Sequence, residues 1–391
     1  MFAVRRNTMK GNSVSKGIGI ATDLIPGLAI CFIITLLGVY LADLIGVFLI
    51  EINLLPAGSA SPISGIFVAI LIGVIIRNTI GLHDVFQRGV KFSLKYALRF
   101  GIILLGLRLS LLEALKMGFW GLPLIIACIS CGLIVTLFFT RKMNQSKSLG
   151  TLIAGGTGIC GVTAIMAIAP VIKAKDNEIS YAVANITMFG LVGMLFYPYL
   201  AQLFFNGDPI KAGLFLGTAI HDTAQVTGAS LMYAQMYDIE KVVDVATVTK
   251  LTRNLFIIAV IPVVSYLFYK GKTSLENEPV IPKWYNLVPL FIIGFLLLTL
   301  IRTIGDMTLT GSGAAFGLFD AAAWENFYTS GSSFGSKYML GIAMAAVGFS
   351  TDFKIFKGLG MKPFYIGLIA AVAVGLVSLL LVSLFGHLIV I

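Results

Sequence analysis

The stretch Gly156-Thr157-Gly158-Ile159-Cys160 interrupts a long apolar segment, and Gly217-Thr218-Ala219-Ile220-His221 repeats its pattern in a second one. Glycines and polar atoms are costly at membrane depth unless they line a cavity or lie inside the protein. Each copy is followed by another apolar segment with its own echo, Val183-Ala184-Asn185-Ile186-Thr187 and Val245-Ala246-Thr247-Val248-Thr249. A duplicated, glycine-interrupted apolar segment is typical of the binding site of a secondary transporter.

The composition predicts a membrane protein. Of the 391 residues, 58% are hydrophobic and 12% are charged, whereas soluble domains have about 25% charged residues. We expect an all-α polytopic membrane protein, a single transmembrane transporter domain over 1–391 with a cytoplasmic N-terminal segment, 1–20. The sequence has about 11 hydrophobic segments: 24–46, 60–80, 92–112, 118–140, 149–173, 180–205, 212–236, 243–269, 285–302, 334–351 and 363–389.

The net charge of +10 is explained by topology rather than by nucleic acid, which we do not expect as a partner. Basic residues gather in alternate loops, for example over 77–99 and 141–147. This positive-inside bias predicts a cytoplasmic N-terminus and an external C-terminus. The longest connection, 302–337, is rich in Gly and Ser, and we expect it to be flexible and external.

Further echoes predict an inverted repeat. The stretch 75–81 resembles 300–305, and 106–110 resembles 348–352, which pairs segments 60–140 with 285–391 in opposite directions. The segments 149–205 and 212–269 pair in the same way only if 149–173 and 212–236 are re-entrant, each leaving on the side from which it came. Nine full crossings and two opposed hairpins then result; broken helices that cross fully are the alternative.

The first copy of the motif offers an anion site. A helix N-terminus near Thr157 or Gly161 would present backbone N–H donors and a partial positive charge, although close packing of small residues is the alternative. The candidate substrate-binding residues here are Thr157, Gly158, Ile159, Cys160, Gly161 and Thr163.

The second copy runs into His221-Asp222-Thr223-Ala224-Gln225, a dense polar stretch in an apolar segment. Ionisable groups at membrane depth usually mark a transport pathway or a proton relay, while a buried hydrogen-bonded cluster is the alternative. We expect Thr218, His221, Asp222 and Gln225 to form the opposing half-site, with His221 and Asp222 coupling transport to H⁺ or Na⁺.

Two cations, Lys250 and Arg253, lie three residues apart on one helical face. An arginine suits an oxyanion because it donates two parallel hydrogen bonds. We therefore expect Arg253 to counter the substrate charge and Lys250 to take part in ion coupling; either could instead neutralise Asp222. Arg99 is equally compatible with an interface anchor and with a vestibule charge.

Catalytic chemistry is not expected. Cys128 and Cys131 have a metal-like spacing, but no second ligand pair accompanies them, and packing explains them better. The Gly331-x-Ser333-x-Gly335 match to a nucleophile motif lacks its strand-turn-helix context. We predict no enzyme activity, no metal and no cofactor.

At these residues the chain resembles the sulfate exporter family of bacterial inner-membrane proteins, also called YeiH-like. The resemblance covers nearly all of the chain and rests on 96–104, 158–165, 170–174, 221–226, 250–253 and 345–351. Where the family has glutamate after the histidine, this chain has Asp222. The resemblance implies a multi-pass protein of the bacterial inner membrane that exports sulfate or a related sulfur oxyanion.

Together these features predict a secondary active transporter of small anions, exporting or exchanging sulfate or related sulfur oxyanions by alternating access within the lipid bilayer. An anion channel and an ion-coupled transporter of organic carboxylates or sulfonates are the alternatives. Such folds commonly form homodimers.

Overall fold

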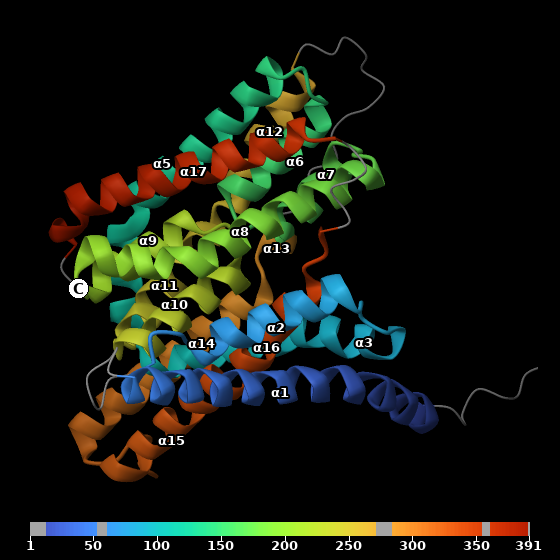
Figure 1. Ribbon diagram of the computed structural model, residues 1–391. Coiled ribbons are helices and arrows are strands. Elements are labelled where there is room, and N and C mark those ends of the chain that lie inside the picture. Colours follow the sequence, from blue (N-terminus) through green and yellow to red (C-terminus); the bar gives the residue numbers. More distant parts are fainter. Residues whose placement is uncertain (1–12, 53–60, 271–283, 354–359, 390–391) are drawn as a thin grey trace, which may run out of the picture.

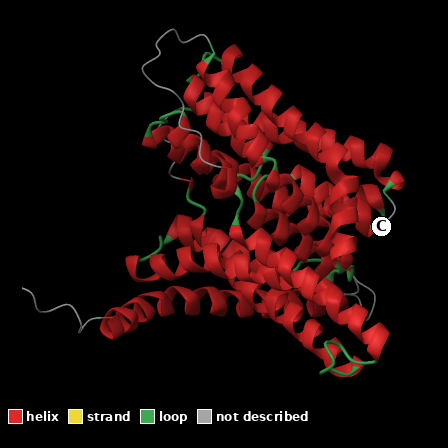
Figure 2. Cartoon of the chain, turned by 180° about the vertical axis from the view of Figure 1, so that it is seen from behind, coloured by secondary structure: helices red, strands yellow, loops and turns green. Residues whose placement is uncertain are grey.

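The computed structural model describes residues 13–52, 61–270, 284–353 and 360–389. Within these residues the regular structure is entirely helical, and one isolated bridge joins Ala315 to Phe319 (Figure 2). Residues 1–12 of the expected cytoplasmic segment lie outside the described residues, and 13–20 begin helix α1 (Ser13–Glu51). The all-α expectation is confirmed.

Five helices of the described chain are long and apolar enough to cross a membrane, or six if one bent pair counts as a span. The five are α1, α5 (Leu111–Lys142), α8 (Asp176–Phe205), α14 (Leu290–Ser312) and α17 (Lys362–Phe385). The bent pair is α11 (Lys241–Leu255) with α12 (Ile257–Tyr269), at 44°. The expected count of about 11 is not confirmed, because several apolar segments form shorter or interrupted helices.

The helices form two groups (Figure 1). The first helix group contains α1, α2 (Gly65–Thr79), α3 (Asp84–Phe92), η1 (Ser93–Ala97), α4 (Leu98–Leu105), η2 (Gly106–Arg108), α14, α15 (Ala321–Phe334), η3 (Gly335–Leu340) and α16 (Gly341–Ser350). The second helix group contains α5, α6 (Lys147–Gly158), α7 (Val162–Val171), α8, α9 (Pro209–Ala219), α10 (Thr223–Tyr237), α11, α12 and α17. One hydrophobic core continues across both groups.

Helices α6 and α7 form a hairpin that starts and finishes at one end of the bundle. The Oγ atom of Ser146, just before α6, lies 2.5 Å from a carboxylate oxygen of Glu178, in the first turn of α8. The two arms pack side by side, since a Cβ atom on Gly156 would lie 3.0 Å from the Ile165 side chain. The first copy of the motif therefore turns back inside the protein.

Helices α9 and α10 form a second hairpin. A Cβ atom on Gly207, just before α9, would lie 3.4 Å from the side chain of Ile239, just after α10. Since α8 runs from the end of the first hairpin to the start of the second, the hairpins come from opposite ends of the bundle. This geometry is re-entrant, and the alternative of broken helices that cross fully does not describe it.

The breaks at the hairpin tips follow from the sequence. Gly161 has φ +67° and ψ −127°, which only glycine adopts readily. A Cβ atom at this position would lie 2.7 Å from Oδ2 of Asp222, so the two tips approach each other closely. The second tip is extended at Ile220 and Asp222.

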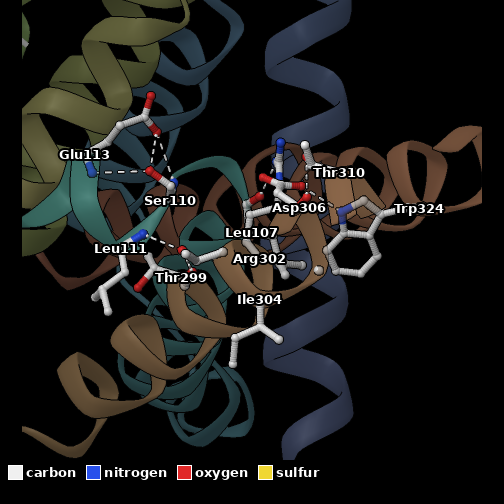
Figure 3. A network of polar contacts seen from close by, with 12 residues as sticks. Leu107, Ser110, Leu111, Glu113, Thr299, Arg302, Ile304, Asp306, Thr310 and Trp324 are labelled. Carbon is white, nitrogen blue, oxygen red and sulfur yellow. Dashed lines mark hydrogen bonds and ion pairs between the residues drawn. The ribbon is translucent and has the colours of Figure 1, made fainter. Parts of the chain in front are cut away.

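The expectation that 302–337 is a flexible connection is wrong for most of this stretch, because it is largely helical. Helix α14 continues to Ser312, and α15 begins at Ala321 with Asp320 as its N-cap. Asp306 accepts hydrogen bonds from Arg302 Nε (2.9 Å) and Trp324 Nε1 (2.8 Å), as Figure 3 shows. This partly buried polar network joins α14 to α15 and holds the two helices together.

The echoed stretches of the first helix group make reciprocal contacts. At one end Arg77 lies 3.0 Å from Asp352, and Asn78 donates to the Thr351 carbonyl (2.9 Å). At the other end Arg302 donates to the Leu107 carbonyl (3.0 Å), and Thr303 Oγ1 accepts from Leu111 N–H (2.7 Å). The stretches 93–97 and 335–340, which lie in the paired segments, are both π-helical.

Candidate functional site

The two hairpin tips meet around cations from α11. Lys250 Nζ donates hydrogen bonds to the carbonyl oxygens of Ile159 (3.2 Å), Ile220 (3.0 Å) and His221. The first carbonyl belongs to one tip and the other two belong to the opposite tip. One ammonium group therefore joins both breaks.

Arg253 lies one helical turn further along α11 and is fully buried. Its guanidinium donates to the carbonyls of Gly158 (3.1 Å), Thr157 (2.7 Å) and Thr218 (2.5 Å). These are among the last carbonyls of α6 and α9, which have no partner within their own helices and carry partial negative charge. Arg253 thus satisfies two helix C-termini at once.

Asp222 lies at the N-termini of α7 and α10, the helix ends that carry partial positive charge. It is the N-cap of α10, and its carboxylate accepts a hydrogen bond from Ala224 N–H at 2.9 Å. The other carboxylate oxygen faces the start of α7, since a Cβ atom on Gly161, the N-cap of α7, would lie 2.7 Å from Asp222 Oδ2. A single acidic side chain therefore lies between two helix N-termini, while two basic side chains hold the two C-termini.

A cavity of about 360 Å³ lies between the two helix groups. The second group contributes Cys160, Thr163, Thr187, Asp222, Thr223 and Gln225 to its wall. The first group contributes basic and apolar residues, among them Lys91, Lys95, Arg99, Ile102, Phe291 and Val347. The N-termini of α7 and α10 thus reach a cavity whose opposite wall is basic.

The basic wall consists of Lys91, Lys95 and Arg99, at intervals of four residues that place them on one helical face. The Arg99 guanidinium lies 5.8 Å from the centroid of the Phe291 ring. In the part of the chain that the structure describes, none of the three forms an ion pair. Lys91 and Lys95 were not among the expected site residues, although their spacing with Arg99 was a usable signal.

Four of the expected site residues line the cavity: Cys160, Thr163, Asp222 and Gln225. Gln225 Nε2 also donates to the Thr187 carbonyl (2.7 Å), which ties α10 to α8. The cavity wall further includes Asn254, whose Nδ2 donates to Thr223 Oγ1 (3.1 Å). Asn254 follows Arg253 directly in the sequence and was not among the expected site residues.

The remaining expected residues lie behind the cavity wall: Thr157, Gly158, Ile159, Gly161, Thr218, His221, Lys250 and Arg253. His221 is buried, and its Nδ1 has no hydrogen-bond partner among the described residues. Thr218 Oγ1 lies 2.7 Å from Ser378 Oγ and donates to the Leu214 carbonyl. Arg253 has backbone carbonyls as partners, where the sequence suggested a substrate anion.

An ion-pair cluster joins the two helix groups away from the cavity. Arg108 lies 2.8 Å from Asp244 and 3.0 Å from Glu240. Asp244 precedes Asn254 by ten residues on α11, a distance of about 15 Å along the helix. The interface between the two helix groups therefore contains a cavity near Asn254, whereas the Arg108 ion pairs join the groups near Asp244.

The family model described as Conserved hypothetical protein 698 matches residues 26–367. A UPF0324 membrane protein of Streptococcus agalactiae serotype V is 31% identical over 368 residues, covering 93% of this chain and 98% of the relative. A UPF0324 membrane protein of Bacillus anthracis is 34% identical over 322 residues, covering 82% and 86%. One from Streptococcus pyogenes serotype M3 is 32% identical over 360 residues, covering 91% and 95%.

Proposed function

The chain belongs to the family described as Conserved hypothetical protein 698, whose relatives are membrane proteins, and from this premise we propose that it is a secondary active transporter of small anions. The observation that carries the proposal is the cavity between the N-termini of α7 and α10 and the basic wall of Lys91, Lys95 and Arg99. Helix N-termini and unpaired cations both favour an anion. We expect no enzymatic activity.

The proposed working cycle is alternating access. The cavity occupies one part of the interface between the helix groups, and the ion pairs of Arg108 hold the groups together in another part. Lys91, Lys95 and Arg99 belong to the basic cluster that the positive-inside rule assigns to the cytoplasm. In this orientation the N-terminus is cytoplasmic and the C-terminus is external. The cavity then opens on the cytoplasmic side of a bacterial inner membrane.

Asp222 is the proposed coupling group. Its carboxylate now offsets the positive ends of α7 and α10. Neutralising it, by a proton or by a bound Na⁺, would free these ends for the substrate anion. Anion binding and cation binding would then favour each other, which is the reciprocity that coupled transport requires. His221 lies directly before Asp222, but is set back from the cavity wall.

Sulfate and related sulfur oxyanions are the first substrates to test, because the chain resembles sulfate exporters. An organic carboxylate or sulfonate is a second candidate, and the apolar part of the wall favours it. Leu94, Leu98, Ile102, Phe291 and Val347 line the cavity, and a volume of about 360 Å³ falls in the range that holds drug-sized ligands. A bare oxyanion would lose hydration against these side chains.

Counter-flow in proteoliposomes tests the proposal. Vesicles are loaded with unlabelled sulfate, sulfite, taurine or an alkanesulfonate, and uptake of the labelled anion is followed. Saturable uptake stimulated by the internal anion is expected. Arg99→Gln and Lys95→Gln should each raise KM about fivefold or more, whereas Lys142→Gln, on a cation outside the cavity, should not. Uptake without stimulation by the internal anion would indicate a channel instead.

A further inference from the structure

A second cavity, of about 240 Å³, lies at the end of the second helix group where α5 finishes and α6 begins. Its polar rim contains Arg141, Gln145 and Lys147, and its apolar wall contains Leu137, Val264 and Leu267. Among the residues that the structure describes, no carboxylate lines it. The cavity is thus basic at its rim and apolar along its wall.

This cavity lies where a bilayer interface is expected. Helix α5 is a candidate span that finishes at Lys142, and α12 ends the bent pair at Tyr269. The neighbouring faces of these helices expose Ile134 (68%), Phe138 (57%) and Val263 (52%), side chains that suit contact with acyl chains. Headgroups lie at the ends of such spans.

We propose that this cavity binds the headgroup of an anionic phospholipid. Arg141 and Lys147 would bind the phosphate by charge-assisted hydrogen bonds, and Gln145 could donate to a polar headgroup. The acyl chains would follow Leu137 and Leu267 toward the exposed apolar face. Lys147 already lies 5.5 Å from the centroid of the Phe268 ring, which holds the ammonium at the rim of the cavity. Basic pockets between membrane helices are known sites for anionic headgroups.

The bound lipid would have a structural consequence for the transport site. Lys147 is the first residue of α6, the first arm of the first hairpin. Tyr269 at the end of α12 donates a hydrogen bond to the Val171 carbonyl at the end of α7 (2.9 Å). A lipid bridging α5, α6 and α12 would therefore fix the outer end of this hairpin.

Thermal unfolding of the purified full chain in neutral detergent tests this inference without any transport assay. Phosphatidylglycerol should raise Tm, and phosphatidylcholine should not. Arg141→Gln/Lys147→Gln should weaken the apparent affinity for phosphatidylglycerol about 30-fold, since each cation near an anionic surface contributes roughly fivefold. Lys142→Gln, on the adjacent residue outside this cavity, should behave like the native chain. Leu267→Trp keeps both cations but fills the apolar wall, and should also lose the response.

An equal Tm increase with phosphatidylcholine, or an unchanged phosphatidylglycerol response in both the double variant and Leu267→Trp, would overturn the proposal. So would an equal response to sn-glycerol 3-phosphate alone, because that outcome requires only a phosphate and no lipid. Native mass spectra of the same samples should show one retained phosphatidylglycerol that the double variant lacks.

Discussion

The Nε atom of Arg108 lies 2.8 Å from a carboxylate oxygen of Asp244, and this ion pair joins η2 of the first helix group to α11 of the second. The Asp244 side chain is 10% exposed and that of Arg108 is 17% exposed, so the pair is largely shielded from solvent. Removing one partner of a shielded pair leaves the other charge uncompensated, so the close arrangement of the two bodies depends on both residues. In this arrangement the candidate transport cavity is open elsewhere along the interface.

Arg108→Gln and Asp244→Asn should therefore destabilise the same closed contact. Each substitution alone should lower the thermal stability and the exchange rate, and the double variant should lose little more than the worse single one. The coupling energy from the double-mutant cycle should be about 0.5–3 kcal/mol. Additive effects would show that the pair does not act as a unit. Lys116→Gln, a cation nearby on α5, is the control.

Arg253→Ala should destabilise the two hairpin tips of the proposed transport site, and its effect should not be limited to a loss of anion binding. Three carbonyls from α6 and α9 would lose their donor, at about 1–3 kcal/mol for each buried acceptor. We expect a large fall in Tm, whereas Arg99→Ala should leave Tm nearly unchanged and lower anion affinity. An Arg253→Ala protein with native Tm and no transport would instead support the substrate-binding role suggested by the sequence.

Gly161→Ala should be far more harmful than Gly313→Ala. Both glycines have positive φ, +67° and +77°, so both substitutions are strained. A Cβ atom at 161 would meet Asp222, whereas one at 313 would have no heavy atom within 4 Å. Gly313→Ala should cost about 1 kcal/mol of conformational strain; Gly161→Ala should cost at least about 1–3 kcal/mol and abolish counter-flow. Comparing Tm and counter-flow of the two variants checks this prediction.

Asp222→Asn should preserve anion exchange but abolish the coupling of transport to an H⁺ or Na⁺ gradient. Asparagine remains a good N-cap, so the start of α10 should persist, while the negative charge between α7 and α10 is lost. We expect KM for the anion to fall about fivefold, counter-flow to continue, and stimulation by a pH or Na⁺ gradient to disappear. Asp222→Ala should in addition lose about 1 kcal/mol of stability with the cap. A higher KM in Asp222→Asn would contradict the proposed coupling.

Much of this arrangement could be predicted from local sequence. The repeated Gly-Thr motif correctly located both interruptions, which follow it directly, at Gly161 in the first hairpin and at Ile220 to Asp222 in the second. Only the first break depends on a glycine, because Gly161 has a positive φ. Apolar composition correctly indicated a helical membrane protein. The length of apolar runs was less informative, because a short helix such as α7 is at least as apolar as a candidate span such as α5.

The partners of the buried charges could not be predicted from the sequence. Arg253 and Asp222 are both ionisable residues in apolar segments, yet one binds helix C-termini and the other lies at helix N-termini. Only the crossing of the hairpins decides which helix ends a side chain can reach. The four-residue spacing of Lys91, Lys95 and Arg99 indicated a shared helical face, but only the packing of the two helix groups shows that this face lines a cavity.

The contacts of Lys250 and Arg253 also restrict how the molecule can move. Both tips are fastened to a single helix, α11, through hydrogen bonds to carbonyls from each. Neither hairpin can withdraw without breaking several buried bonds, so the two half-sites keep a constant separation. A pair of spin labels, one on each hairpin, should report the same distance in every state. A pair with one label on a hairpin and the other on α4 should report several distances. Translocation would then be the movement of one rigid body past the other, with the anion bound in the cavity between them.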